Sequence, residues 1–253
     1  MNTVKIRNIE IGSGLPKICV PIVGTTKEDI LTEAYKLGSL PLDIAEWRVD
    51  WFEYAYDFSK VEDILKHLRA VLGETPLLMT FRTSNEGGKK SIEPGDYAKL
   101  IVSASETGYV DLVDVEAFTE TDIVKEIITG THNAGVKVIG SNHDFNNTPD
   151  KDVIIARLRK MQDIGVDISK IAVMPADNKD VITLLAATEE MYRKYADRPI
   201  VTISMSETGV LSRICGEAFG SAIAFGAAKS ASAPGQMEVN DLNTVLKLLH
   251  DYL

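Results

Sequence analysis

The most regular feature of the chain is an alternation of short, apolar, strand-like runs with longer segments of helical pattern. The short runs predict eight strands, which cover residues 18–23, 43–50, 76–83, 109–117, 137–145, 168–175, 198–206 and 220–227. The segments that follow them predict helices, which cover residues 26–37, 60–72, 94–107, 120–134, 149–164, 178–195, 209–216 and 239–253.

Eight strands that are each followed by a helix indicate a (β/α)8 TIM barrel, with an open doubly wound sheet as the alternative. Residues 4–11 predict a short extended segment ahead of the barrel. No Pro/Ser-rich tract, charge block or shift in composition marks a linker, so residues 1–253 are expected to form a single barrel domain. In such barrels the chemistry lies at the C-terminal ends of the strands.

The second predicted strand carries charges at alternate positions. Glu46, Arg48 and Asp50 alternate with two tryptophans and a valine. A period of two places the charges on one face and the apolar residues on the other. In a barrel the charged face would point into the mouth, although an edge strand with one wet face has the same pattern.

Lys170 lies in the middle of an apolar, strand-like run that ends at Pro175. A lysine there must reach water, pair with a carboxylate, or lie partly neutral in a dry pocket, because burying an unpaired charge is costly. The dry pocket would make it a nucleophile toward carbonyl groups. An exposed strand end or a structural ion pair is the alternative.

Polar residues also gather at two other strand ends. Arg82 and Glu86 end the third strand ahead of two glycines, and His143 alone among the four histidines lies at a strand end. If Glu86 contacts His143, the imidazole would be an oriented general base with a pKa close to neutrality. The alternatives are a solvated glycine-rich turn and a structural histidine.

The seventh and eighth loops carry residues suited to binding an anion. Arg213 is expected one turn inside a helix, where cation and helix N-terminus together favour a negative charge. Ser232 and Gln236 add hydrogen-bonding side chains that turn geometry alone does not explain. Other arginines are interpreted as charges on helix surfaces: Arg69, Arg157, Arg159 and Arg193.

The charge balance narrows the classes of partner. A formal net charge of −10 argues against sequence-independent binding to nucleic acid or to an anionic membrane. Cys19 and Cys215 are far apart and lack metal-ligand spacing, which fits buried thiols in a reducing compartment. With no apolar run near the roughly 18 residues of a membrane span and no signal-like segment, a cytoplasmic protein is expected.

Six segments together resemble the type I 3-dehydroquinate dehydratase family of the shikimate pathway across essentially the whole chain. They are Glu-Trp-Arg at 46–48, Phe-Arg-Thr at 81–83 with Glu-Gly-Gly at 86–88, Ser-Asn-His-Asp-Phe at 141–145, Lys-Ile-Ala-Val-Met-Pro at 170–175, Ser-Arg at 212–213 and Ser-Ala-Pro-Gly-Gln at 232–236. Pro21 departs from members that have serine at this position. Because proline has no hydroxyl, a substrate contact there is in doubt.

The resemblance implies dehydration of 3-dehydroquinate to 3-dehydroshikimate. By position, Lys170 resembles the Schiff-base lysine, His143 the proton-transfer residue and Glu86 its orienting partner. The family's carboxylate site matches Arg213, Ser232 and Gln236, and its contacts to the ring hydroxyls match Glu46, Arg48 and Arg82. No metal or organic cofactor is expected, and a homodimer is favoured.

Three rival functions stay open from the residues alone. A class I aldolase would need the same lysine, but also a phosphate site that the eighth loop does not obviously offer. A metal-dependent enzyme could use His143 with Asp144, Asp114 or Glu116. A non-catalytic barrel that binds small carboxylates is the third.

Overall fold

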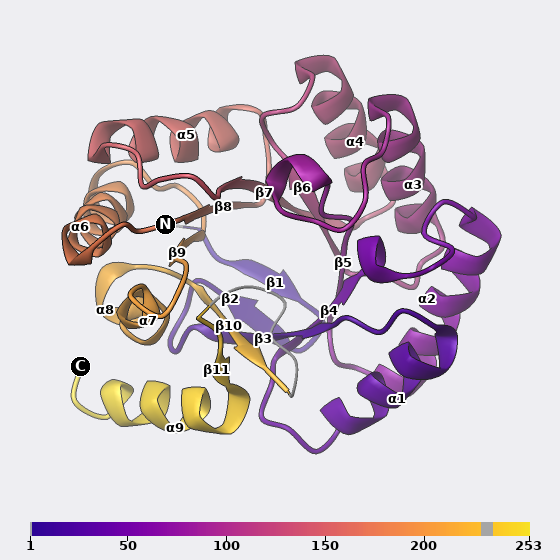
Figure 1. Cartoon of the computed structure of the whole chain (residues 1–253), viewed down its shortest axis with the longest axis horizontal. Helices are drawn as coiled ribbons and strands as arrows, with labels where there is room; N and C mark the ends of the chain where they lie inside the picture. The colour runs from indigo at the N-terminus through magenta and orange to yellow at the C-terminus, as the bar shows by residue number, and fades with distance from the viewer. Residues whose placement is uncertain (1, 229–234) are drawn as a thin grey trace.

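In the computed structural model, which describes residues 2–228 and 235–253, nine parallel strands form one curled sheet with helices around its outside (Figure 1). Eight of them match the predicted barrel strands: β3 (Lys17–Ile22), β4 (Ile44–Arg48), β5 (Leu77–Thr80), β6 (Leu112–Glu116), β7 (Lys137–Asp144), β8 (Ile168–Val173), β9 (Ile200–Ser204) and β10 (Ile223–Ala227). The short β11 (Met237–Glu238), which was not predicted, adds to β10. The (β/α)8 barrel is therefore confirmed.

The ring closes between β9 and β10 through few bonds. Ala222 N donates to the carbonyl of Ile200 at 2.8 Å, and Thr202 N donates to the Ser221 hydroxyl at 3.0 Å. A side chain thus replaces one backbone partner at this seam. Closure matters for function because it directs the inward side chains of distant strands toward one axis.

The helices cover the outer face of the sheet (Figure 1). They are α1 (Lys27–Leu37), α2 (Phe58–Leu72), α3 (Pro94–Glu106), α4 (Thr121–Asn133), α5 (Lys151–Asp163), α6 (Asn178–Lys194), α7 (Val210–Ile214), α8 (Gly216–Phe219) and α9 (Val239–His250), with 3-10 turns η1 (Val49–Trp51) and η2 (Ser84–Glu86). Helix α2 begins two residues before the predicted start, because the Asp57 side chain accepts from Ser59 N and Lys60 N and caps it there. The helix predicted at 209–216 is instead split at Cys215 into α7 and α8.

The segment before the barrel is an antiparallel hairpin of β1 (Val4–Ile6) and β2 (Ile9–Ile11), rather than a plain extended segment. Its buried side chains pack with the first inward residues of the barrel strands, among them Cys19 and Ile44. The hairpin therefore forms the floor of the barrel. At the same end Arg69, interpreted from the sequence as a surface charge, instead donates to Asp111 at 2.7 Å.

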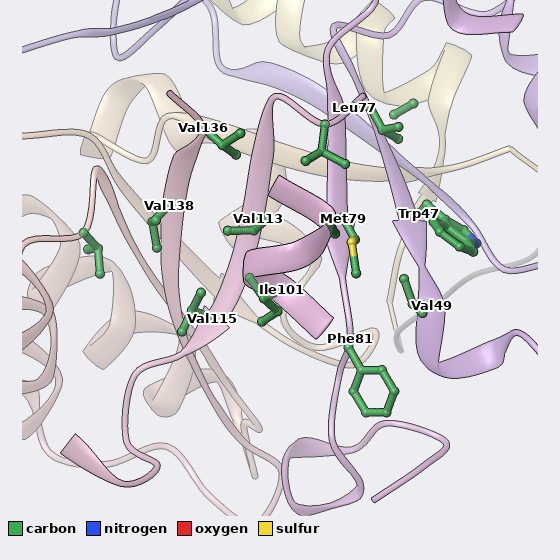
Figure 2. Close-up of a cluster of buried hydrophobic side chains, with 14 of the residues drawn as sticks. Trp47, Val49, Leu77, Met79, Phe81, Ile101, Val113, Val115, Val136 and Val138 are labelled. Carbon is green, nitrogen blue, oxygen red and sulfur yellow. The ribbon is translucent and has the colours of Figure 1, made fainter. Parts of the chain in front are cut away.

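Alternation along the strands separates the apolar core from the site. Outward residues of β4 to β7 pack under the helices, as Figure 2 shows for Trp47, Met79, Val113 and Val138. Inward positions are apolar near the floor and polar toward the C-terminal ends, where the buried residues are Glu46, Thr80, Asp114, Ser141 and Lys170. Among the described residues, no helix has the length and apolar character needed to cross a membrane.

Candidate active site

One cavity lies at the C-terminal ends of the barrel strands. Eight of the nine predicted site residues line it: Glu46, Arg48, Arg82, Glu86, His143, Lys170, Arg213 and Gln236. The ninth, Ser232, falls outside the described residues. The barrel therefore gathers side chains from six different segments into one space.

Lys170 projects from β8 into this cavity and is only 4% exposed. Its Nζ donates to Asp114 Oδ2 at 3.0 Å and lies 4.6 Å from the centre of the Phe225 ring. Of the three options for a lysine in a strand, the structure has the pairing with a carboxylate. The amine is nonetheless at the cavity wall, where a small carbonyl compound could meet it.

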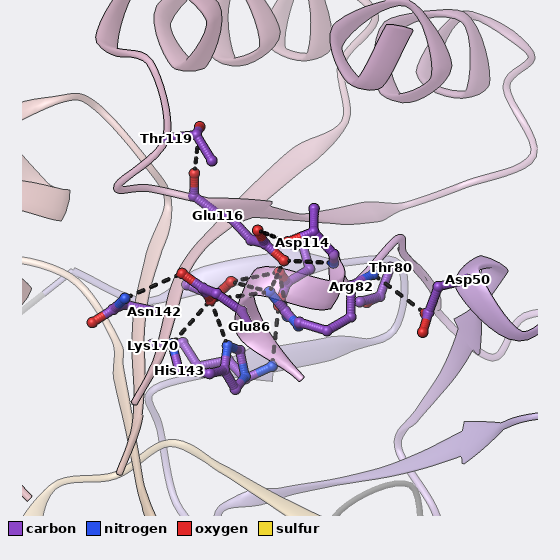
Figure 3. A network of polar contacts seen from close by, with 12 residues as sticks. Asp50, Thr80, Arg82, Glu86, Asp114, Glu116, Thr119, Asn142, His143 and Lys170 are labelled. Atoms are coloured by element: carbon purple, nitrogen blue, oxygen red, sulfur yellow. Dashed lines mark hydrogen bonds and ion pairs between the residues drawn. The ribbon is translucent and has the colours of Figure 1, made fainter. Parts of the chain in front are cut away.

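Asp114, on β6, is the hub of the polar network under the cavity (Figure 3). Besides Lys170, its carboxylate accepts from Arg82 Nη2 at 2.6 Å and from Ser141 Oγ at 2.6 Å. These cations hold the pKa of Asp114 well below its usual range, although burial alone would raise it. From the sequence Asp114 was expected only as a possible metal ligand, although two acids, Asp114 and Glu116, alternate with apolar residues along β6 and indicate an inward polar face.

Glu86 and His143 form the second centre of the network (Figure 3). Glu86 Oε2 accepts from His143 N at 2.9 Å and lies 2.9 Å from His143 Nδ1. The turn that carries Glu86 depends on Gly88, where an added Cβ would lie 1.8 Å from the Arg82 carbonyl oxygen. Close approach of backbone to backbone thus fixes the position of the carboxylate.

Burial dominates the protonation of this pair. It raises the pKa of Glu86 to about 7, although Arg82 opposes the shift. Burial, followed by the charges of Arg82 and Lys170, brings the pKa of His143 well below its usual value. The near-neutral pKa predicted for His143 is therefore wrong, because an imidazole beside two cations and out of water favours its neutral form.

The residues expected near substrate hydroxyls are held by ion pairs and hydrogen bonds. Arg48 donates to both oxygens of Asp50 at 2.8 Å, a bidentate pair. Thr80 Oγ1 donates to Glu46 Oε1 at 2.8 Å. Arg82 also donates to Glu116 Oε1 at 3.1 Å, so most of its bonds are made within the protein. This side of the cavity is polar and fixed in position.

Arg213 and Gln236 line the cavity together with apolar residues. Arg213 is buried on α7, and desolvation lowers its pKa to about 10. The preceding Ser212 anchors the helix, since its hydroxyl accepts from Ser204 N at 2.9 Å. Helix α7 has only five residues, so the argument for an anion site rests on the buried guanidinium rather than on a helix N-terminus. The cavity also has an apolar lining that was not predicted from the sequence, formed by Phe145, Ala172, Ile203, Met205 and Phe225.

Within the part of the chain that the structure describes, no group of three or more His, Cys, Asp or Glu side chains is arranged to hold a metal ion. Each oxygen of the Asp114 carboxylate instead pairs with a cationic side chain, Oδ1 with Arg82 at 2.6 Å and Oδ2 with Lys170 at 3.0 Å. The carboxylates at this end of the barrel therefore have ammonium and guanidinium groups as their partners.

Comparisons with known proteins agree along the chain. Residues 18–252 match the model of the family described as Type I 3-dehydroquinase. A 3-dehydroquinate dehydratase of Clostridioides difficile is 54% identical over 247 residues, which cover 98% of this chain and 97% of the relative. One of Listeria monocytogenes is 51% identical over 250 residues, or 99% of each chain.

Solved structures give the same result. A type I 3-dehydroquinate dehydratase from Clostridium difficile superposes with a TM-score of 0.97 at 53% identity, over 100% of this chain and 99% of that one. A 3-dehydroquinate dehydratase from Geobacillus kaustophilus gives a TM-score of 0.96 at 36% identity, over 99% and 97%. Sequence, fold and cavity thus point the same way, and the chain belongs to the type I 3-dehydroquinase family.

Proposed function

We propose that the chain converts 3-dehydroquinate into 3-dehydroshikimate and water through a Schiff base on Lys170, with His143 as general acid and base. The observation that carries this proposal is a primary amine, 4% exposed, in a cavity that His143 also lines. A buried amine next to an acid–base residue suits covalent catalysis on a ketone. The reaction belongs to the shikimate pathway, which leads to chorismate and the aromatic amino acids.

The covalent steps begin at the ring ketone. Lys170 gives a proton to His143 and attacks the carbonyl carbon, and the resulting carbinolamine loses its hydroxyl as water, with the proton returned by His143, to give a protonated imine and neutral His143. The imine draws electrons from the neighbouring C–H bond and makes that proton acidic. Asp114, bonded to Nζ at 3.0 Å, is placed to balance the positive charge of the imine.

Proton transfer then completes the elimination. Neutral His143 removes the proton alpha to the imine, the ring hydroxyl leaves, and the imidazolium returns the proton to it as water. Water next hydrolyses the conjugated imine, which frees 3-dehydroshikimate and the Lys170 amine. Imine formation releases one water and hydrolysis consumes one, so the net product of the elimination is a single water.

Binding contacts orient the ring for these steps. Arg213 takes the substrate carboxylate, with Gln236 and Ser232 as further hydrogen-bonding partners. Glu46, Arg48 and Arg82 take the ring hydroxyls on the opposite side. Fixing both ends of a small ring places its ketone against Lys170, and such orientation supplies a large part of the rate.

A covalent ligand in the structure of a relative supports this proposal. The Clostridium difficile structure, 53% identical to this chain, contains covalently modified comenic acid. Comenic acid carries a ring ketone and a carboxylate, the two groups that the proposed reaction uses. We propose further that the protein acts in the cytoplasm as a homodimer; both stay predictions that size measurement and fractionation would test.

Borohydride trapping tests the covalent route. The protein is incubated with 3-dehydroquinate and borohydride, which reduces an imine to a stable amine, and intact and peptide masses are measured. We expect one adduct, on the peptide that contains Lys170, and neither adduct nor turnover in Lys170→Ala. His143→Ala should still form the imine but stall afterward. Turnover by Lys170→Ala at a rate near wild type would refute the covalent route, and adducts formed only with phosphorylated ketoses would favour an aldolase.

A further inference from the structure

A second cleft adjoins the active-site cavity at His143. It has a volume of about 600 Å³, and it shares Gly87, His143 and Phe145 with that cavity. Its outer wall includes Arg157 from helix α5. The side chain of Arg157 is 29% exposed, so this charge on the helix surface is partly buried and not fully solvated.

Arg157 is linked to the catalytic pair by two hydrogen bonds in series. Its Nη1 donates to Asn142 Oδ1 at 3.0 Å and to Asp144 Oδ2 at 3.3 Å. Asn142 Nδ2 in turn donates to Glu86 Oε1 at 3.1 Å. The link exists because strand alternation sends His143 toward the barrel axis and Asn142 toward the outer face, while Glu86 reaches both from the turn η2 that follows β5.

The direction of these bonds follows from the chemistry of arginine. A guanidinium has donors only, so the carbonyl oxygen of the Asn142 amide must face Arg157 and the NH2 group must face Glu86. Without Arg157 the amide could turn over and present its oxygen to Glu86, which a carboxylate would oppose and a protonated carboxyl would favour. Arg157 thus selects the amide orientation that stabilises ionised Glu86.

The protonation of Glu86 decides which nitrogen of His143 can act as a base. Ionised Glu86 accepts the proton of Nδ1 at 2.9 Å and leaves Nε2 unprotonated. A protonated Glu86 donates to Nδ1 instead, so the neutral ring carries its proton on Nε2 and cannot accept one there. Only the first state provides a base toward the cavity.

Several other charges act on this pair. Arg82 Nη1 lies 3.5 Å from Glu86 Oε2, and Arg82 and the Asn142 hydrogen bond lower the pKa of Glu86, while burial and the charges of Glu116 and Asp114 raise it. On His143, the charges of Arg82, Lys170 and Arg48 oppose protonation and that of Asp114 favours it. Because the resulting pKa of Glu86 is about 7, the loss of one favourable bond would change the ionised fraction in the working pH range.

We propose that Arg157 is a positioning residue that acts through Asn142 to keep Glu86 ionised and His143 in the tautomer that accepts a proton. This inference rests on the proposed role of His143 as general base. Arg157 itself touches neither the substrate nor the reacting atoms, since its contacts lie in the second cleft.

The test compares Arg157→Met with Arg159→Met, the same change two residues further along α5, where the exposed side chain stacks on Tyr195 at 4.8 Å. The acid limb of the pH profile of kcat/KM should shift to higher pH by about one unit in Arg157→Met. The reason is that a hydrogen bond to a charged group favours the ionised over the protonated form of Glu86 by roughly tenfold. We expect kcat to fall about tenfold at pH 6 and less than about threefold at pH 9, with KM little changed. Arg157→Lys should restore part of the loss, and Arg159→Met should match wild type.

A second readout does not depend on activity. The ¹⁵N shifts of His143 report its tautomer, and at pH 7.5 we expect Nδ1–H in wild type and an increased Nε2–H fraction in Arg157→Met. An acid limb and a tautomer both unchanged in Arg157→Met would overturn the proposal. If that variant does not fold, Asn142→Ala breaks the same link from its other end. Failure of the proposed function would differ, because His143→Ala would then keep full turnover whatever the tautomer.

Discussion

Single residues in the mouth gain their reactivity by being removed from water. Glu86 and His143 are both driven toward their neutral forms, whereas Asp114 stays ionised because Arg82 and Lys170 contact it. Burial is common to all of them, so their different states follow from the charge of the nearest partner. Such a site costs stability wherever a charge is kept without a full set of partners.

Glu86→Gln should therefore stabilise the fold at alkaline pH while it impairs turnover. The folded pKa of Glu86 is raised from 4.5 to about 7, so the folded state binds more protons than the unfolded state between these values, and stability falls as pH rises through them. Above pH 7 the cost is complete, at most roughly 3 kcal/mol. Gln is neutral throughout and removes it.

Thermal unfolding at pH 5 and pH 8 measures this effect. The Tm of Glu86→Gln should exceed that of wild type by a few degrees at pH 8, given about 2–4 °C per kcal/mol for a chain of this size. At pH 5 the difference should be much smaller. An equal difference at both values of pH would show that ionisation of Glu86 is not its cause.

At the scale of elements, strand ends and short turns place the chemistry, and the remaining elements hold the barrel in shape. The end of β7 illustrates the first role, because consecutive residues Asn142 and His143 contact Glu86 from opposite faces of the sheet. The β1–β2 hairpin illustrates the second. It packs on the apolar inward residues at the floor, on the far side of the polar layer from the cavity.

Ile11→Ala should destabilise the protein without changing its catalysis. Ile11 is fully buried in the floor, and truncating a buried isoleucine costs about 2–5 kcal/mol through lost burial and the cavity left behind. Urea unfolding should show this loss, while kcat and KM at 25 °C stay within about twofold of wild type. A comparable change at Ile9, which is only partly buried, should cost less. A large change in KM would mean that the floor also shapes the mouth.

Carboxylates with lowered pKa values occur throughout the molecule, from the barrel interior to the outer helices. Asp114 lies in the polar layer, Asp167 at the N-terminal end of β8, and Glu190 on the outer helix α6. A depressed folded pKa contributes stability that is present above the ordinary carboxyl pKa of about 4 and is lost as pH falls through the folded value. Acid should therefore weaken the fold as a whole rather than one region.

Urea unfolding at pH 6, 4 and 3 should show this dependence. We expect the free energy of unfolding to fall by about 1 kcal/mol from pH 4 to pH 3 through Asp114 alone, since one carboxylate with a depressed folded pKa loses at most about 1.4 kcal/mol of stabilisation per pH unit. Asp114→Asn should start from lower stability, because Arg82 and Lys170 lose their charged partner, and should lose less on acidification. If the free energy of unfolding of Asp114→Asn fell with pH as steeply as that of wild type, Asp114 would not be a source of the acid sensitivity.

The sequence by itself determined the order of elements, the barrel, and the set of side chains at the strand ends. These follow from short-range periodicity and from the rule that chemistry in a barrel lies at the C-terminal ends of its strands. Lys170, His143 and Glu86 were identified in this way, as were Arg213 and Gln236, and their roles stay proposals.

Only the tertiary structure decided which of these residues are partners. Lys170 pairs with Asp114, 56 positions away, although Glu86 and Glu116 carry the same charge; the stagger between strands sets that choice, and no local pattern encodes it. The split of helix 209–216, the hairpin floor and the contacts of Arg157 with Asn142 and Asp144 were likewise not predictable. Burial and neighbouring charges, which set each pKa, exist only once the barrel has closed.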